Sequence, residues 1–353
     1  MIGVHGIGTY FPAEVRTNAW WPAELVAGWM DARAKRPPPP LAADASAGVR
    51  RVAKAMAEQA HDPFQGTRER RVAAASETIA DMEEQAARSA LARAGTDPSA
   101  IDLLLVHTVV PDVLLSNPAA VLHRRLGLGS ACLALQADGA AYSFLAQLAV
   151  AEAMIVSGRA KVALLVQSCV ATRLIDREDP GSVLVGDGAA AVVLGQVSGD
   201  RGFLGAVHYT DGRFPNSLVM SVPGGTWMDA GRARMHVADP LQMRDVFLST
   251  ADVCKQSVDD LLAKIGLAVS DIGYLCVYQG TAWLRRVVHD YLGIGEVRSV
   301  ETFSRYGYLS AAMIPVNLAA AEAEGELHDD ALVVLTGGGT GMTYGAAALR
   351  WGR

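Results

Sequence analysis

The turn Asp138–Gly139–Ala140–Ala141 has the small residues of a strand-to-helix turn that carries a catalytic nucleophile. The residues from Cys132 to the turn predict a strand, and those after it, up to Lys161, predict a long helix. Such a sharp turn exposes its apex side chain, and the free N–H groups and dipole of the helix stabilise an anion there. The apex residues are nevertheless alanines, followed by Tyr142. The sequence therefore predicts a turn of the kind that carries a catalytic nucleophile, but without a nucleophilic side chain at its apex.

The composition is that of a large globular protein. The chain has 353 residues, 51% of them apolar and 19% charged, with a formal net charge of −6. This length allows two domains or one duplicated fold, and the negative charge argues against nucleic acid as the main partner. Apolar runs such as Leu103–Val106 suit buried strands and are too short for a membrane span. Without a signal-peptide pattern or a metal spacing among the four cysteines, a cytoplasmic protein with buried thiols and no metal is expected.

An internal repeat positions the turn within two similar halves. Residues 91–108 align without gaps on 262–279, each reading as a helix end, a glycine cap, a loop and a buried strand. A second pair, 148–166 and 317–335, repeats a helix followed by a strand. One duplication of such α/β units predicts a layered fold with a pseudo-twofold axis, and a ligand site where the halves meet.

The stretch from Ala27 to Gln65 interrupts this pattern. Its proline run, in KRPPPP, is expected to be an exposed, extended segment. Between Asp31 and Lys54 there are six basic residues and two acidic ones. The stretch is either an insertion with a solvated helix or a docking surface for an acidic partner.

Five motifs in order resemble the β-ketoacyl-acyl-carrier-protein synthase III family of the thiolase superfamily. The family's Arg-rich loop and helix is matched by GTRERRVAAASETIADMEEQAARSALARAG, and its dimer-interface segment by VVPDVLLSNPAAVLHRRLGL. Its GDGAGA strand is matched by VLVGDGAAAVVLG, and the loop of its second half by RYGYLSAAMIP. Its C-terminal Gly-rich hairpin is matched by TGGGTGMTYGAAALRW. The resemblance covers nearly the whole chain except the insertion, about 27–65. It implies a thiolase-like, five-layered α/β/α/β/α fold, with halves at 1–195 and 196–353.

The resemblance also implies a catalytic cysteine, histidine and asparagine, and this chain departs from all three. In the family the cysteine forms an acyl thioester, and the other two stabilise the enolate left by decarboxylation of the extender. By motif, the cysteine falls on Ala141, the histidine on Tyr278 and the catalytic asparagine on Tyr308. A single Cys→Ala difference could be an engineered substitution, whereas differences at all three catalytic positions indicate a natural sequence.

Three other residues near the turn carry side chains that could replace the missing cysteine or act as a base. Cys132 starts the preceding strand, and Ser143 points about 200° around the helix from Ala141, so we expect neither to be the nucleophile. Asp138 is either a cap or a general base.

Tyr278 and Tyr308 are expected to point into a cavity above Ala141. A phenol, with an ordinary pKa of about 10, is a poor base at neutral pH but a good hydrogen-bond donor. The pair is either a non-covalent oxyanion hole or two rings that fill a disused pocket. His107, the repeat counterpart of Tyr278, is expected to be structural.

The resemblance implies a carrier-binding surface as well. Arg68 matches the arginine beside the adenine of coenzyme A, Arg285 and Arg286 lie near a basic patch for carrier phosphates, and Gly338 lies in the backbone of the acyl site. Thr281 takes the place of the asparagine three positions after the histidine in the same family motif, and it is assigned to the same binding set. The expected substrate is a thioester of coenzyme A or phosphopantetheine, with no permanently bound cofactor.

Two classes of function remain open. The first is a non-covalent acyltransferase or condensing-type enzyme of fatty-acid or polyketide-type specialised metabolism, acting on acyl-CoA or an acyl carrier protein. The second is a catalytically silent subunit that pairs with an active synthase III-like protein, so either a homodimer or a heterodimer is expected. An open cavity that reaches both tyrosines favours the enzyme, whereas rings packed on Ala141 favour the silent subunit.

Overall fold

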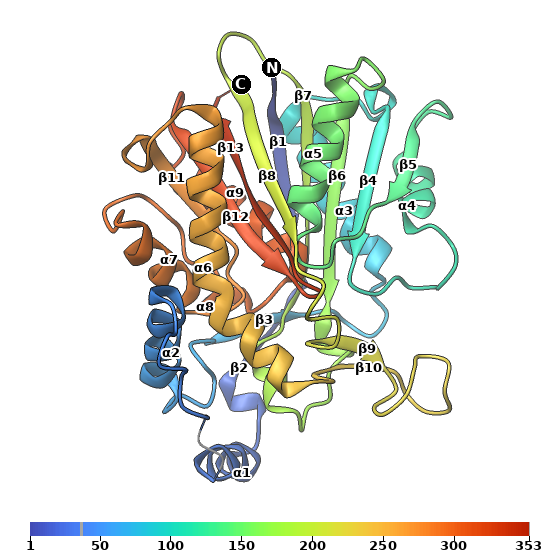
Figure 1. Cartoon of the computed structure of the whole chain (residues 1–353). Helices are drawn as coiled ribbons and strands as arrows, with labels where there is room; N and C mark the ends of the chain where they lie inside the picture. Colours follow the sequence, from blue (N-terminus) through green and yellow to red (C-terminus); the bar gives the residue numbers. More distant parts are fainter. Residues whose placement is uncertain (36–37, 353) are drawn as a thin grey trace.

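Two mixed β-sheets, one from each half of the chain, form the centre of the protein (Figure 1). The structure, a computed structural model, describes residues 1–35 and 38–352. The first sheet has the order β1-β7-β6-β4-β5 and the second β11-β12-β13-β8. Their strands are β1 Ile2–Tyr10, β4 Leu103–Thr108, β5 Leu133–Gln136, β6 Ala163–Val170, β7 Asp187–Gln196, β8 Gly202–Thr210, β11 Ile272–Val277, β12 Leu332–Gly339 and β13 Thr343–Arg350. Two short ribbons, β2 Glu14–Thr17 with β3 Glu69–Val72 and β9 Val219–Ser221 with β10 Arg234–His236, complete the strands.

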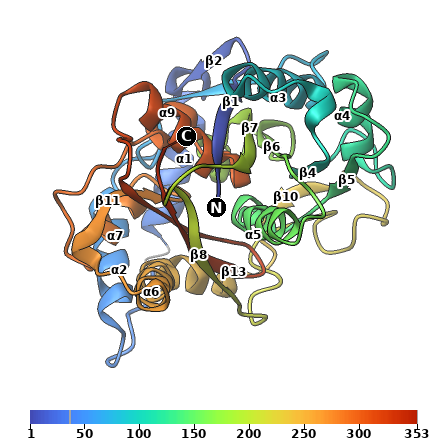
Figure 2. The same cartoon turned by 90° about the horizontal axis from the view of Figure 1, so that it is seen from above.

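Helices cover both sheets and fill the space between them. One apolar core packs α5 and α9 between the sheets, a second lies between the first sheet and α3 and α4, and a third between the second sheet and α6 and α7. Figure 2 shows this order from above. The helices are α3 Ile79–Ala94, α4 Pro118–Leu126, α5 Ser143–Val156, α6 Pro240–Ile265, α7 Leu284–Leu292, the single turn α8 Phe303–Tyr306 and α9 Met313–Ala323. The predicted five-layered α/β fold is confirmed.

The internal repeat is a structural repeat. Gly95 ends α3 and Gly266 ends α6, both in the left-handed conformation, with φ of 61° and 70°. Each is followed by a 3₁₀ turn and a buried strand, β4 or β11. Each of these strands then pairs in parallel with the strand of the second repeated unit, β6 or β12. The glycine cap and the apolar run are therefore the sequence features that fix the repeat, because only glycine takes this conformation without strain.

The insertion forms two helices, α1 Ala23–Ala34 and α2 Ala47–Gln59. Helix α2 is solvated on one face only: it packs on α6 and α7 and buries Val52 and Ala55, while Arg50, Arg51 and Lys54 are exposed. Pro38–Pro40 are exposed, as predicted, while the first proline of the run, Pro37, lies outside the described residues. In the described part of the chain, no helix is both long and apolar enough to cross a membrane.

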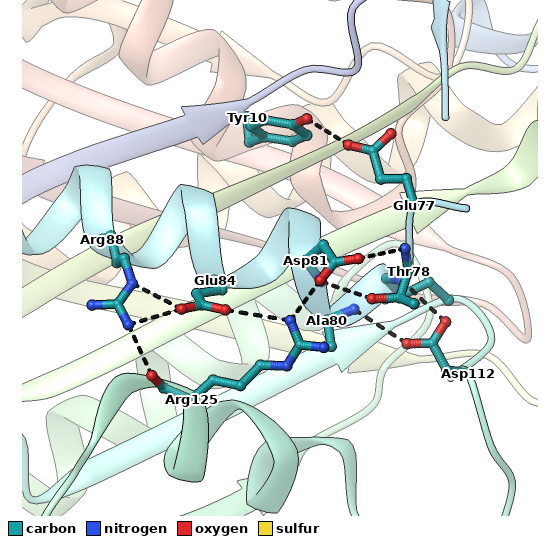
Figure 3. Close-up of polar contacts among 10 residues, drawn as sticks. Tyr10, Glu77, Thr78, Ala80, Asp81, Glu84, Arg88, Asp112 and Arg125 are labelled. Carbon is teal, nitrogen blue, oxygen red and sulfur yellow. Dashed lines mark hydrogen bonds and ion pairs between the residues drawn. The ribbon is translucent and has the colours of Figure 1, made fainter. Parts of the chain in front are cut away.

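Charged side chains fix the start of α3 and the loop after β4 (Figure 3). The Asp112 carboxylate accepts hydrogen bonds from the backbone N–H groups of Ile79 (3.1 Å) and Ala80 (3.2 Å). Arg125 of α4 donates to Asp81 (2.7 Å) and Glu84 (3.3 Å) on α3. Carboxylates at a helix N-terminus are stabilised by the free N–H groups and the dipole there. This network therefore holds the loop after β4 against the first sheet's outer helices.

Candidate functional site

An apolar cavity of about 390 Å³ lies where the two halves meet. Its walls come from α6, the β9–β10 hairpin, residues 175–185 and the loops that follow β11 and β12. Aliphatic, aromatic and methionine side chains predominate, including Leu218, Met235, Met243, Phe247, Leu284 and Met342. The volume is within the range of small-molecule sites, about 300–1,000 Å³, and methionines adapt to different ligand shapes. The cavity suits an apolar chain or ring.

Tyr278 and Tyr308 both line this cavity, as the sequence predicts. The backbone N–H of Tyr278, just after β11, donates to Thr336 O (2.8 Å), and that of Tyr308 donates to Leu184 O (2.6 Å). The ring centroids are 6.1 Å apart with the planes at 90°, a favourable edge-to-face contact. Burial raises the pKa of both phenols, and the proximity of Tyr308 raises that of Tyr278 further. Both are therefore neutral O–H donors at physiological pH.

Ala141 is buried next to the cavity but is not part of its lining. The backbone of Gly339 covers the turn so closely that a Cβ there would lie 2.8 Å from Gly139 O and 3.0 Å from Ala141 N. Ala140 has a φ of 52°, an uncommon conformation for a residue with a side chain. The sharp turn and the helix are thus present as predicted. The expectation that both phenols share an open space with Ala141 is corrected, because the Gly339 backbone lies against the turn.

The polar residues of the turn hold its shape. Ser143 Oγ donates to Ala140 O (2.6 Å) and accepts from the N–H of Gly139 (2.8 Å). The Asp138 carboxylate accepts from the N–H of Ala140 (2.7 Å), so Asp138 closes the turn rather than capping α5, whose first flanking residue is Tyr142. Neither Ser143 nor Asp138 lines the cavity.

His107 and Cys132 lie on the first sheet's side of the turn. The His107 ring is 2% exposed, and its Nδ1 lies 3.3 Å from Asp138 Oδ1. Neither ring nitrogen has an aligned hydrogen bond within the described chain, so the two side chains are close neighbours. His107 nevertheless holds the pKa of Asp138 below its ordinary value. Cys132 is half-buried, and burial raises the pKa of its thiol, which disfavours a thiolate.

Of the five residues expected to bind the carrier, two line the cavity. Thr281 and Gly338 are part of its wall, and the buried Thr281 Oγ1 has no hydrogen-bond partner among the described residues. Arg68 is exposed and lies outside the lining. Arg285 is half-buried and donates weakly to Ser299 O (3.5 Å), and its neighbour Arg286 forms an ion pair with Glu58 of α2 (3.1 Å). The structure therefore brings the tyrosines, Thr281 and Gly338 together but leaves the arginines outside.

The cavity wall that α6 supplies was not predicted from the sequence. Six of its residues line the cavity: Met243, Val246, Phe247, Thr250, Val253 and Cys254. Their spacing of three or four residues marks one face of a helix, which is a detectable signal, but this face reads equally as core. The hydrogen bond between Tyr142 OH and His208 Nδ1 (2.7 Å), which ties α5 to β8, had no sequence signal at all.

Comparisons with known proteins agree with this architecture. A family model described as 3-oxoacyl-[acyl-carrier-protein (ACP)] synthase III matches residues 135–212, and one for the C-terminal part of that enzyme matches 262–351. The β-ketoacyl-[acyl-carrier-protein] synthase III of Rhizorhabdus wittichii is 33% identical over 288 residues, covering 81% of this chain and 88% of the relative.

Solved structures are similar over nearly the whole chain. The 3-oxoacyl-[acyl-carrier-protein] synthase III of Aquifex aeolicus VF5 has a TM-score of 0.79 at 26% identity, covering 99% of this chain and 100% of that one. The priming β-ketosynthase of the R1128 polyketide biosynthetic pathway has a TM-score of 0.79 at 26% identity, covering 99% and 96%. The chain therefore belongs to the 3-oxoacyl-[acyl-carrier-protein] synthase III family.

Proposed function

We propose that this chain binds acyl thioesters of coenzyme A or an acyl carrier protein and transfers the acyl group without an acyl-enzyme intermediate. The observation that carries the proposal is the apolar cavity, which reaches two neutral phenols, Tyr278 and Tyr308. The family's catalytic histidine and asparagine match these two positions by motif, and its cysteine matches Ala141. The change at all three positions favours a different chemical route on a retained thioester-binding scaffold.

The two phenols can act in acyl transfer as hydrogen-bond donors rather than as bases. The lone pair of an alcohol or amine acceptor attacks the thioester carbonyl, the C–S bond breaks, and the acceptor's proton passes to the leaving thiolate. Phenol O–H groups stabilise the charge that develops on the carbonyl oxygen, and such donors contribute most in a site from which water is excluded. Thr281 Oγ1, buried and unpartnered within the described residues, offers a further hydrogen bond to a polar part of the substrate.

Cys254, the cysteine that lines the cavity, does not fit the role of nucleophile. Cys254 is 3% exposed, and burial raises the pKa of its thiol to about 12. The nucleophile and metal ligand is the thiolate, which is nearly absent at neutral pH when the pKa is so high. A route through an acyl-Cys254 thioester is therefore disfavoured.

A silent subunit in a dimer is the second candidate. The Gly339 backbone against the turn separates Ala141 from the cavity, which fits a site that no longer takes an acyl group. The edge strand β5 also leaves Leu133 and Leu135 more than two-fifths exposed. An unpaired edge with apolar side chains suits pairing with another chain, either a second copy or an active relative.

The test compares Tyr308→Phe with the wild type in acyl transfer from octanoyl-CoA to a panel of alcohols and amines. Loss of one donor to the developing oxyanion lowers kcat by roughly 10²–10³-fold with little change in KM. Tyr306→Phe is the matched control, because Tyr306 stacks on Phe11 (centroids 4.0 Å apart) and is not part of the cavity lining. Equal rates for Tyr308→Phe and the wild type would refute the oxyanion role. Absence of transfer by the wild type, with activity restored by an added synthase III, would favour the silent subunit.

A further inference from the structure

A polar corner of the cavity lies where α7 begins. Gly280, Thr281, Trp283 and Leu284 line the cavity at this corner. A Cβ on Gly280 would lie 2.8 Å from Cε1 of Tyr278 and 3.5 Å from its OH, so the Tyr278 ring lies over the residues that lead into α7. The phenol and the start of α7 are therefore neighbours in the cavity wall.

This corner offers hydrogen-bond donors that have no acceptor within the described chain. Thr281 Oγ1 is buried and unpartnered there. Helix α7 has no capping side chain at Trp283 and no acidic residue in its first turn. The N–H groups of Leu284 and Arg285, at the start of this helix, have no backbone acceptor among the described residues. Buried donors without partners are costly, so they indicate a ligand group that accepts hydrogen bonds.

The group that fits this corner best is a carboxylate. A carboxylate only accepts hydrogen bonds, and the positive end of a helix dipole stabilises its charge. An amide or ester carbonyl also accepts, but it gains less from the dipole because it carries no net charge. Among the described lining residues, Asp179 is the only acid, and its carboxylate already accepts from the N–H of Gly181 (2.7 Å). The wall therefore opposes a negative ligand group with little negative charge.

The chemistry of a thioester assigns this carboxylate to the acyl acceptor. On one side of its carbonyl a fatty-acyl thioester has an uncharged chain, and on the other it has the neutral amides of the pantetheine arm. The phosphate lies at the far end of that arm. An anionic group close to Tyr278 therefore belongs to the second substrate. An amino acid would also bring an ammonium group to a corner made of donors, whereas a hydroxy acid brings a neutral hydroxyl.

We propose that the corner formed by Thr281 and the start of α7 binds the carboxylate of the acyl acceptor, and that this acceptor is a hydroxy acid. The inference rests on the acyl transfer proposed above. The hydroxyl oxygen attacks the thioester carbonyl, a C–O bond forms, the C–S bond breaks, and the hydroxyl proton passes to the leaving thiolate. The products are an acyloxy acid and a free thiol. The bound carboxylate positions the acceptor's hydroxyl next to the carbonyl that the phenols bind.

Binding of the carboxylate can be measured without any reaction. Isothermal titration calorimetry compares octanoate with octanamide, a neutral ligand of nearly the same shape. The wild type is expected to bind octanoate roughly tenfold more tightly, the size of one charge-assisted hydrogen bond. Thr281→Val is expected to weaken octanoate binding roughly tenfold, whereas Thr281→Ser, which keeps the hydroxyl, should bind as the wild type does. Thr250→Val is the matched control and should also bind like the wild type, because Thr250 lines the same cavity but its Oγ1 already donates to Phe247 O (2.7 Å).

A transfer assay then identifies the substrate that carries the carboxylate. With octanoyl-CoA as donor, 3-hydroxybutyrate is expected to have a kcat/KM roughly tenfold higher than its methyl ester, and Thr281→Val to remove this preference. Equal values for the acid and the ester, or a preference for 3-aminobutyrate, would overturn the assignment to a hydroxy acid.

The two assays separate the carboxylate site from the acyl transfer. Equal affinities of the wild type for octanoate and octanamide, or an unchanged octanoate affinity in Thr281→Val, would overturn the carboxylate site itself. Octanoate binding that depends on Thr281, without transfer to any acceptor, would support the site but refute the proposed acyl transfer.

Discussion

The free energy of unfolding of the wild type is expected to fall as the pH rises, because Glu83 is buried. Replacing Glu83 by glutamine is expected to abolish this pH dependence. Glu83 is 1% exposed in α3, and its Oε1 accepts a hydrogen bond from Ser168 Oγ (2.7 Å). Burial raises the pKa of this carboxyl from 4.5 to about 8, so it is protonated in the folded protein at neutral pH. In the unfolded chain it is ionised above its ordinary pKa. Folding must therefore take up a proton, and its free energy becomes less favourable with pH.

The size of the effect follows from the two pKa values. Below pH 4.5 the carboxyl is protonated in both states and has no pH-dependent effect. Between 4.5 and about 8 the folded state binds more protons than the unfolded state, so stability falls over this window. At 1.36 kcal/mol per pKa unit, the full loss of stability is about 5 kcal/mol. Glutamine keeps an oxygen that can accept from Ser168 but does not titrate.

The assay is urea unfolding of the wild type and Glu83→Gln at pH 5, 6, 7, 8 and 9. The gap between the two midpoints is expected to widen up to about pH 8 in favour of Glu83→Gln, and then to level off. Glu84→Gln is the neighbouring control, because Glu84 forms ion pairs with Arg88 and Arg125 at the surface. Midpoints of Glu83→Gln and the wild type that run parallel from pH 5 to 9 would refute a protonated, buried Glu83.

Further predictions concern the turn, the helix start and the tie between the halves. In Gly339→Ala the new Cβ meets backbone atoms of the turn at 2.8–3.0 Å, so urea unfolding should show a loss of about 1–3 kcal/mol in the free energy of unfolding. Gly295→Ala is the control, because Gly295 has open space around it. Equal losses in the two variants would contradict the close approach of Gly339 to the turn. Asp112→Asn keeps an acceptor for the N–H groups of Ile79 and Ala80 but removes the negative charge, so it should cost about 0.3–1 kcal/mol, seen as a lower Tm by circular dichroism, whereas an unchanged Tm would argue against a contribution of this charge to the start of α3. Tyr142→Phe removes the hydrogen bond to His208 and should cost about 1 kcal/mol; a Tm equal to that of the wild type would show that the bond adds nothing.

The layered fold could be predicted because its signals are local. The glycine caps at Gly95 and Gly266 and the apolar runs after them mark the same unit twice, and a repeated unit implies a repeated arrangement. The turn before α5 was predictable for a similar reason, since small residues between an apolar strand and an apolar helix leave few alternatives.

Burial of polar or basic segments could not be read in the same way. Six basic residues in and before α2 suggest a solvated helix, yet the opposite face carries Val52 and Ala55, which pack against α6, a helix about 190 residues away in the chain. Glu83 and Glu84 look alike in sequence. Only the apolar stripe of Ile79, Met82, Ala86 and Ala90 indicates that Glu83 faces the core.

The meeting of the two tyrosines was predictable, but the α6 wall and the shape of the cavity were not. Tyr278 and Tyr308 lie 30 positions apart, and the repeat and the motifs brought them to one place, where their rings are in contact. The backbone of Gly339 against the turn depends on where β12 ends relative to α5, a tertiary distance with no local signal. The sequence therefore predicted which side chains meet, but not that Ala141 lies outside the cavity.

The most direct test of the central claim is mass spectrometry of the wild-type protein with octanoyl-CoA. Native spectra are expected to show a non-covalent complex, because the apolar cavity takes the acyl chain. Denaturing spectra of the same sample are expected to show the unmodified mass, because Ala141 supplies no thiol and the buried Cys254 is not ionised. An octanoyl adduct that survives denaturation would contradict acyl transfer without an acyl-enzyme, and the absence of any complex would contradict thioester binding.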